Sequence, residues 1–115
     1  GASIEIGDNT RIHGSCIHAL SSISIGRNCL IAGNCQIIDG SGHDIESNNR
    51  LEVSFKAQPI VIEDNVWLGT GVIVLPGTTI GSGSVISAGS VVKGIVEKDC
   101  LIMGNPAKVV KRLDK

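Results

Sequence analysis

Aliphatic residues recur at every sixth position over most of this sequence. A helix repeats its apolar side chains with a period of 3.6 residues and a strand with a period of 2, so a period of six indicates a short strand and a corner that alternate. The residues four places after these aliphatics are all small. The aliphatic series is Ile6, Ile12, Ile25, Ile31, Ile37, Ile62, Leu68, Val74, Ile80, Ile86 and Val92; the small series is Thr10, Cys16, Cys29, Cys35, Val66, Val72, Thr78, Ser84 and Ser90.

Three such units predict an 18-residue coil of triangular section. Each aliphatic side chain points into the prism, each small residue fits where two faces meet, and successive coils pair as parallel strands. A prism this narrow has no room for rings, which agrees with Trp67 and Phe55 being the only aromatic residues. Asn and Gly recur near the expected corners, where they tolerate a positive φ. The repeat therefore predicts an all-β protein, a parallel β-helix.

The repeat is interrupted in three places. Ile25 follows Ile6 by 19 residues, which predicts a one-residue bulge between His18 and Ser22. Between Ile37 and Ile62 there are seven residues more than one coil, which predicts a protruding loop at about 44–58. Beyond Val92 the phase is lost, and residues 94–115 are expected to form an irregular turn and a short terminal strand or helix that caps the stack. We expect one domain, residues 1–115, of about four coils.

The charge balance excludes several classes of partner. The formal net charge is −1, from ten Lys and Arg against eleven Asp and Glu, which argues against a general electrostatic hold on nucleic acid or an anionic membrane. No apolar stretch approaches the roughly 20 residues that span a bilayer. No charged-then-apolar signal segment opens the chain, so we expect a cytoplasmic protein with no membrane span.

The four cysteines contain no C-x-x-C pair, so a zinc cage is poorly supported and we expect no metal. Three of them, Cys16, Cys29 and Cys35, occupy the small inward place of the repeat and are expected to be buried. Cys100 lies outside the repeat and has no neighbouring pattern typical of a nucleophile.

Three segments closely resemble the hexapeptide-repeat acyltransferases, and within them the sugar O-acetyltransferases related to galactoside, maltose and capsule-modifying enzymes. The period alone does not set the hand of the coil; the resemblance implies a left-handed β-helix and a homotrimer. It also implies acetyl-CoA as the donor and a hydroxyl of a sugar or surface-polysaccharide unit as the acceptor. The segments are IGRNCLIAGNCQIIDGSGH (25–43), PIVIEDNVWLGTGVIVLPGTTIG (59–81) and GNPAKVVK (104–111).

His43 is the predicted catalytic residue. It opens the predicted loop, and functional groups concentrate on loops that a rigid scaffold holds. Acetyl transfer to a hydroxyl needs a base, and imidazole titrates near neutrality. The resemblance places the family's catalytic histidine on His43. The alternative is a loop histidine without a role.

The resemblance also implies where the coenzyme lies. Trp67 immediately precedes the inward Leu68 and should point outward, either beside the coenzyme or in simple trimer packing. Related enzymes often have Thr-Lys where this chain has Lys93 and Gly94, which shifts the cation by one place. The basic C-terminal residues are otherwise a solvated tail. The predicted cofactor-binding residues are Trp67, Thr70, Ala88, Lys93, Gly94, Lys108 and Lys111.

Two further residues are weaker candidates for the acceptor site, Asp39 and His13. Asp39 is expected to orient His43, to bind a sugar hydroxyl, or to hydrogen-bond its own backbone at a corner. The five-residue spacing of His13 and His18 is similar to the histidine pair of the gamma-class carbonic anhydrases. A zinc enzyme of that kind, and a non-catalytic β-helix scaffold, are therefore the alternatives to an acetyl-CoA-dependent O-acetyltransferase.

Overall fold

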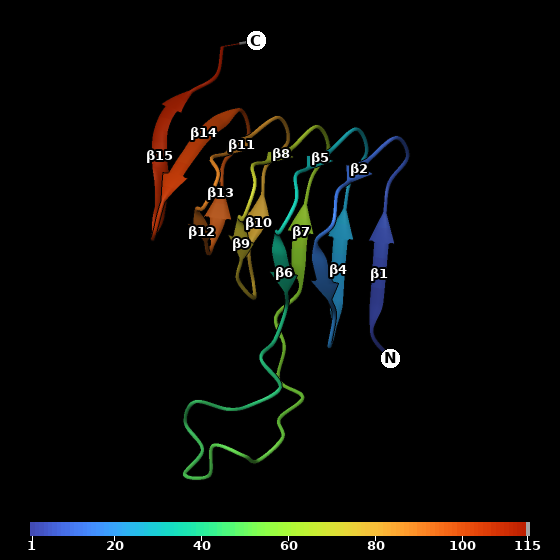
Figure 1. Cartoon of the computed structure of the whole chain (residues 1–115), viewed down its shortest axis with the longest axis vertical. Helices are drawn as coiled ribbons and strands as arrows, with labels where there is room; N and C mark the ends of the chain where they lie inside the picture. Colours follow the sequence, from blue (N-terminus) through green and yellow to red (C-terminus); the bar gives the residue numbers. More distant parts are fainter. Residues whose placement is uncertain (115) are drawn as a thin grey trace.

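The computed structural model describes residues 1–114, which wind into a three-sided coil of about five turns (Figure 1). The first face holds β1 (Ser3–Ile6), β4 (Ser22–Ile25), β7 (Ile60–Ile62), β10 (Thr79–Ile80) and β13 (Ile95–Val96). The second face holds β2 (Arg11–Ile12), β5 (Leu30–Ile31), β8 (Trp67–Leu68), β11 (Val85–Ile86), β14 (Cys100–Gly104) and β15 (Ala107–Arg112). The third face holds β3 (Cys16–His18), β6 (Gln36–Ile38), β9 (Ile73–Val74) and β12 (Val91–Val92).

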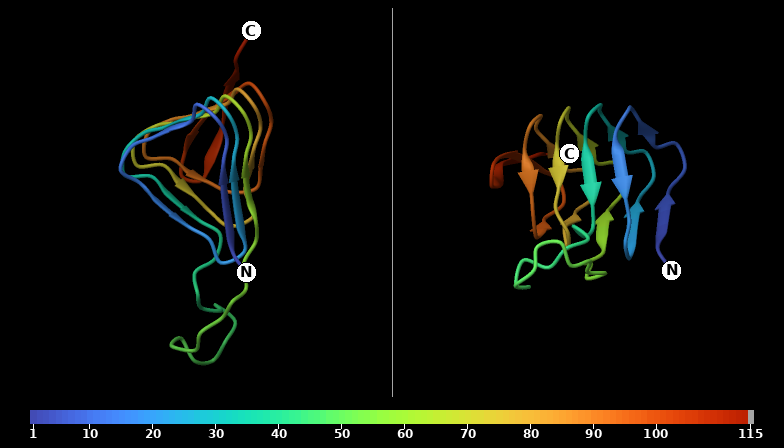
Figure 2. Two further views of the ribbon diagram at one scale, coloured as in Figure 1. Left: turned by 90° about the vertical axis from the view of Figure 1, so that its right-hand side faces the viewer. Right: turned by 60° about the horizontal axis from the view of Figure 1, so that its bottom comes forward.

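Neighbouring coils pair as parallel strands, as the repeat predicts. Inward residues lie in register from one coil to the next; Ile31, for example, pairs with Leu68, which pairs with Ile86. Seen from the end that carries the N-terminus, the chain runs counter-clockwise as it recedes, so the coil is left-handed (Figure 2, left). The predicted fold class, a left-handed parallel β-helix, is confirmed.

The interior is a column of aliphatic side chains with small polar residues beside it. Ile31, Ile37, Leu68 and Ile86 are completely buried. The small inward residues close the corners through hydrogen bonds. The Ser84 hydroxyl, for example, donates to a carbonyl of the next coil, 2.7 Å away, and accepts from the Cys100 N–H at 3.1 Å. Corner asparagines have the expected positive φ, as at Asn9, Asn28, Asn34 and Asn65.

The C-terminal region contains one more coil than expected, because the repeat resumes after Val92. Val96 pairs with Ile80 and Ile102 with Ile86, a separation of 16 residues where the regular repeat has 18. The corner between β12 and β13 is shortened, and Gly94 adopts a φ of 87° there. The prediction of about four coils was therefore slightly too low. β15 then turns back and pairs antiparallel with β14, so the predicted terminal cap is a strand.

Cys100 therefore lies inside the repeat, contrary to the prediction. It is 1% exposed and takes the small inward place of the last coil. Its thiol lies 3.4 Å from the Lys98 carbonyl oxygen. Because the corner before β13 is two residues shorter than in the regular repeat, a strict period of six does not predict this inward position.

The first coil also departs from the predicted register. Ile17, and not His18, pairs with the inward Ile37, and the Ser15 hydroxyl takes the small inward place by accepting from the Cys35 N–H at 3.0 Å. Compared with the regular repeat, the first coil therefore has one residue fewer before Ser15 and two residues more in the corner that follows β3. As a result Cys16, which the sequence predicted to be buried, is exposed, and so is His18. Cys29 and Cys35 are buried as expected.

The predicted loop lies between β6 and β7 and projects from the corner where the third face meets the first (Figures 1 and 2). It spans the expected residues 44–58 and a few on either side. The described part of the chain has no helix that is long and apolar enough to cross a bilayer.

Candidate functional site

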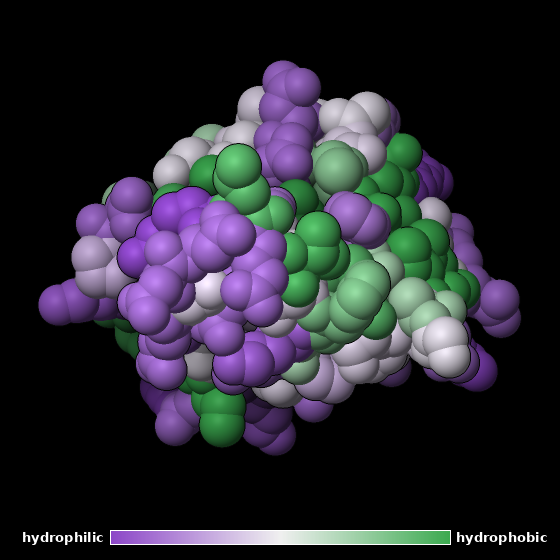
Figure 3. Space-filling model, turned by 90° about the horizontal axis from the view of Figure 1, so that it is seen from below, coloured by the Kyte–Doolittle hydropathy of each residue, from purple (hydrophilic) through white to green (hydrophobic). Residues whose placement is uncertain are grey.

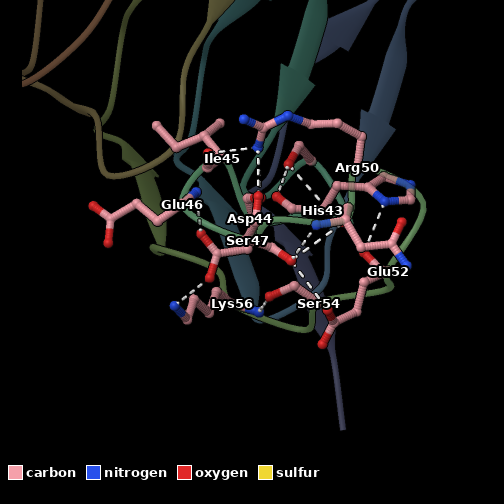
Figure 4. Close-up of polar contacts among 11 residues, drawn as sticks. His43, Asp44, Ile45, Glu46, Ser47, Arg50, Glu52, Ser54 and Lys56 are labelled. Carbon is pink, nitrogen blue, oxygen red and sulfur yellow. Dashed lines mark hydrogen bonds and ion pairs between the residues drawn. The ribbon is translucent and has the colours of Figure 1, made fainter.

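The loop holds the His43 imidazole in one orientation. His43 forms an antiparallel bridge with Val53, and the Ser54 N–H donates to the Gly42 carbonyl at 2.7 Å. The ring Nδ1 lies 3.0 Å from the Glu52 carbonyl oxygen (Figure 4). A carbonyl oxygen only accepts, so Nδ1 is the donor in this contact, and in the neutral ring Nε2 keeps its lone pair. Because the side chain is exposed, Nε2 is available to accept a proton from a substrate.

An ion pair ties the two arms of this loop together. The Lys56 ammonium lies 2.6 Å from an Asp44 carboxylate oxygen (Figure 4). The hydrogen bond from Lys56 holds the pKa of Asp44 below its ordinary value, and the same bond raises the pKa of Lys56. The Arg50 guanidinium donates to the Ser47 carbonyl at 3.0 Å on the same loop. These contacts help to fix the backbone that carries His43.

Asp39 anchors the base of the loop to the first coil. Its side chain is fully buried, and its two carboxylate oxygens accept from the N–H groups of Leu20, at 2.7 Å, and Ser21, at 2.8 Å. Its own carbonyl accepts from the Gln58 N–H at 2.9 Å. Asp39 therefore braces the corner between His18 and Ser22, where the sequence predicted a bulge; this bracing role was not predicted. Its predicted contact with the acceptor stays a prediction.

Replacing Asp39 with alanine is expected to lower the free energy of unfolding by about 1–3 kcal/mol, because two backbone N–H groups lose their acceptor. Chemical denaturation measures the change. Asp8→Ala, at an exposed corner, is the matched control and should shift stability by less than about 0.5 kcal/mol. A loss of activity with unchanged stability would instead place Asp39 at the acceptor.

The second face carries a groove of about 450 Å³ in which three of the predicted coenzyme-binding residues meet: Trp67, Thr70 and Ala88. Trp67 is 50% exposed, which confirms its outward orientation. Small residues one place after the inward aliphatics also line the groove. These are Ala32, Gly69 and Ser87 on successive coils. Ala32 and Ser87 were not predicted site residues, although their places after the inward Ile31 and Ile86 mark them as outward.

Other predicted site residues lie at the two ends of the second face. Lys111 pairs with Leu101 and Lys108 with Met103 on the last strands, and both lysines are exposed. At the N-terminal end, the His13 N–H donates to the Ile31 carbonyl, which places His13 beside Ala32 in the neighbouring coil. His13 is exposed there.

Lys93 and Gly94 are not brought to this groove. They follow β12, at the corner between the third and first faces, which is also the corner that carries the loop with His43. The predicted site residues thus form two groups on one chain. Trp67, Thr70, Ala88, Lys108 and Lys111 belong to the second face, and His43, Lys93 and Gly94 to the loop corner. The third face separates the two groups, and no loop residue lines the groove.

A metal centre finds no support in residues 1–114. Among them, no group of three or more His, Cys, Asp or Glu side chains is placed to hold an ion. His13 and His18 lie on different faces of the first coil.

Comparison with known proteins gives matches along most of the chain. A family model described as bacterial transferase hexapeptide (six repeats) matches residues 59–94, and one described as hexapeptide repeat of succinyl-transferase matches residues 3–38. A Saccharomyces cerevisiae protein, named as a candidate acetyltransferase, is 41% identical over 114 residues, which are 98% of this chain and 58% of that protein.

Solved structures give the same result. A hexapeptide-repeat acetyltransferase from Vibrio cholerae O1 biovar eltor, complexed with acetyl coenzyme A, matches with a TM-score of 0.88 and 37% identity over 97% of this chain and 61% of that one. A maltose O-acetyltransferase from Clostridium difficile 630 matches with a TM-score of 0.88 and 36% identity over 97% of this chain and 60% of that one. The chain thus spans less than two thirds of the length of each of these proteins.

Proposed function

Because the chain belongs to the hexapeptide-repeat transferase family, we propose that it transfers an acetyl group from acetyl coenzyme A to a hydroxyl of a saccharide. The observation that carries this proposal is the orientation of His43. Its Nδ1–H is engaged by the Glu52 carbonyl, so Nε2 is ready to accept a proton. The donor is supported by the acetyl coenzyme A complex of the Vibrio cholerae protein, and the acceptor by the name of the maltose O-acetyltransferase.

His43 acts as the general base in this proposal. As the acceptor oxygen attacks the thioester carbonyl, its proton moves to Nε2 of His43. The C–S bond then breaks, and the coenzyme A thiolate leaves and takes up that proton. The products are the acetyl ester and free coenzyme A, and His43 is neutral again. Direct transfer needs no cysteine nucleophile. Cys29, Cys35 and Cys100 are buried in the prism, and the exposed Cys16 lies on the third face and does not line the donor groove.

The groove on the second face suits the pantetheine arm of the donor. Its small residues Ala32, Gly69 and Ser87 leave room along the stacked strands, and Trp67 forms one wall. Lys108 and Lys111 at the C-terminal end provide cations for the phosphates of the coenzyme. Backbone N–H groups near Gly69 are proposed donors to the oxyanion of the tetrahedral intermediate.

The complete site is proposed to form between two copies of the chain. The donor groove and His43 belong to different corners of one prism, and a neighbouring prism could bring its loop to this groove. Four large apolar side chains of the loop are exposed: Ile45 (84%), Leu51 (84%), Phe55 (82%) and Val53 (64%). Hydrophobic residues also gather beside the mainly hydrophilic loop (Figure 3), where a hollow is lined by Ile38, Ile73, Leu75 and Pro76. Such surfaces typically mark an interface, and a homotrimer would cover them.

Release of coenzyme A from acetyl-CoA, measured against a panel of saccharides, tests the proposal. We expect release that depends on the saccharide, together with calorimetric binding of coenzyme A. Succinyl-CoA in the same assay tests the acyl group. Absence of coenzyme A binding would favour the scaffold, and stoichiometric zinc in the purified protein would favour the metal enzyme. The cytoplasmic location stays a prediction.

A further inference from the structure

We infer that Arg11 makes this protein selective for an acceptor saccharide that carries a carboxylate. The inference rests on the proposed acetyl transfer, and it names the class of substrate. It concerns the N-terminal end of the second face, beyond the donor groove, where the acceptor would approach the thioester.

Strand register places Arg11 in line with the donor groove. Arg11 pairs with Leu30, Leu30 with Trp67, Trp67 with Val85, and Val85 with Leu101. Adjacent strands are about 4.8 Å apart, so Arg11 lies about 10 Å from Trp67 along the face. Because Lys111 pairs with Leu101, the same row of outward residues ends in a cation at each end. The C-terminal cation suits the phosphates of the donor, and the N-terminal one remains for the acceptor.

The charge environment leaves the Arg11 guanidinium free. None of the six strands of the second face contains Asp or Glu. Arg11 is exposed, and among residues 1–114 its side chain has no hydrogen bond or ion pair. The corner between the first and second faces carries Asp8, Glu63, Asp64, Glu97 and Asp99. Asp8, on the same coil as Arg11, makes no ion pair with it. On the third coil, Asp64 accepts from the Arg27 N–H at 2.8 Å and Glu63 from the Ser82 N–H at 3.0 Å.

Arg11 also lines a hollow of about 220 Å³ with Asn9, Asn28 and Leu30. The Asn9 amide nitrogen donates to the Asn28 side-chain oxygen at 2.8 Å, which leaves the Asn28 amide N–H groups free. A guanidinium fork beside a free amide donor matches the oxygens of a carboxylate, because Arg binds carboxylates through two parallel hydrogen bonds. His13 follows the end of β2, two residues after Arg11, and adds a ring that can hydrogen-bond sugar hydroxyls.

The test compares acidic and neutral forms of the same acceptor. Methyl glycosides of glucuronic, galacturonic and N-acetylneuraminic acids are each paired with their carboxamide, which has the same shape without the charge. The full chain and its Arg11→Gln variant are assayed for kcat/KM, and coenzyme A binding is measured separately. Arg27→Gln is the matched control, because this exposed arginine lies at the corner and outside the second face.

We expect the protein to prefer at least one acid over its carboxamide by about 10- to 100-fold, the range for a hydrogen-bonded charge pair. Arg11→Gln should remove this preference, change the rate with the carboxamide by no more than a few fold and leave the affinity for coenzyme A unchanged, whereas Arg27→Gln should retain the preference. Equal use of acid and carboxamide, or a preference that survives Arg11→Gln, overturns the inference while the proposed function stands. Coenzyme A binding without acetylation of any saccharide, acidic or neutral, overturns the proposed acceptor and this inference together.

Discussion

Replacing His43 with alanine is expected to lower kcat/KM for acetyl transfer by about 10²- to 10⁴-fold, the usual contribution of a positioned general base. The variant loses the Nε2 atom that would take the acceptor proton. Coenzyme A affinity should not change, because His43 does not line the donor groove. Stability should also be nearly unchanged, because the ring is exposed. Coenzyme A release, calorimetry and thermal unfolding measure the three quantities.

Glu52→Ala is the matched control for His43. The imidazole is held by the backbone carbonyl of Glu52, which this substitution keeps; the side chain itself only accepts from the Ser47 hydroxyl at 3.0 Å. We therefore expect activity within a few fold of the unaltered protein. An His43→Ala variant that retains activity within tenfold would remove His43 from the mechanism.

Replacing Ser87 with tryptophan is expected to weaken coenzyme A binding by at least about 100-fold. Ser87 is one of the small outward residues that line the groove, and it lies between Gly69 and Met103 of the neighbouring coils. An indole at this position fills the space proposed for the pantetheine arm. A hundredfold loss corresponds to about 2.7 kcal/mol at 25 °C. The inward neighbour Ile86 is untouched, so the β-helix should still fold. Calorimetric titration with coenzyme A measures the affinity, and circular dichroism reports on the fold.

Ser87→Ala provides the comparison at the same position. It removes the hydroxyl but leaves the groove open, and coenzyme A affinity should stay within a few fold. If Ser87→Trp bound coenzyme A as tightly as Ser87→Ala, the donor would have to bind elsewhere on the molecule.

Sequence periodicity predicted most of the fold because burial in a narrow prism allows few residue types. The inward places of Ile31, Leu68 and Ile86 follow directly from the period of six, and the structure buries all three. The errors arose where a corner changes length. The shortened corner at Gly94 placed Cys100 inside the prism, and the altered first coil placed Cys16 outside it. Corner length depends on backbone dihedrals and hydrogen bonds, and the period alone does not predict them.

The functional groups were harder to predict than the fold. His43 could be singled out because it opens the loop, but its partner is the backbone carbonyl of Glu52, and every residue has such a carbonyl. The bracing role of Asp39 depends on the two extra residues near Leu20, which appeared in the sequence only as a shift of register. The separation of Lys93 from Lys108 likewise follows from their places in the fold: Lys93 lies at the corner between the third and first faces, and Lys108 lies on β15 of the second face.

We propose that the complete site combines His43 of one copy with the groove of a neighbouring copy in a homotrimer. Mixing His43→Ala and Ser87→Trp chains in equal amounts, unfolding them together and refolding them into mixed trimers tests it directly. If the site is shared, an intact loop meets an intact groove in about a quarter of the interfaces, and about a quarter of the original coenzyme A release should return. If each chain carries its own complete site, every site holds one defect, and mixed trimers that remain inactive would contradict the account.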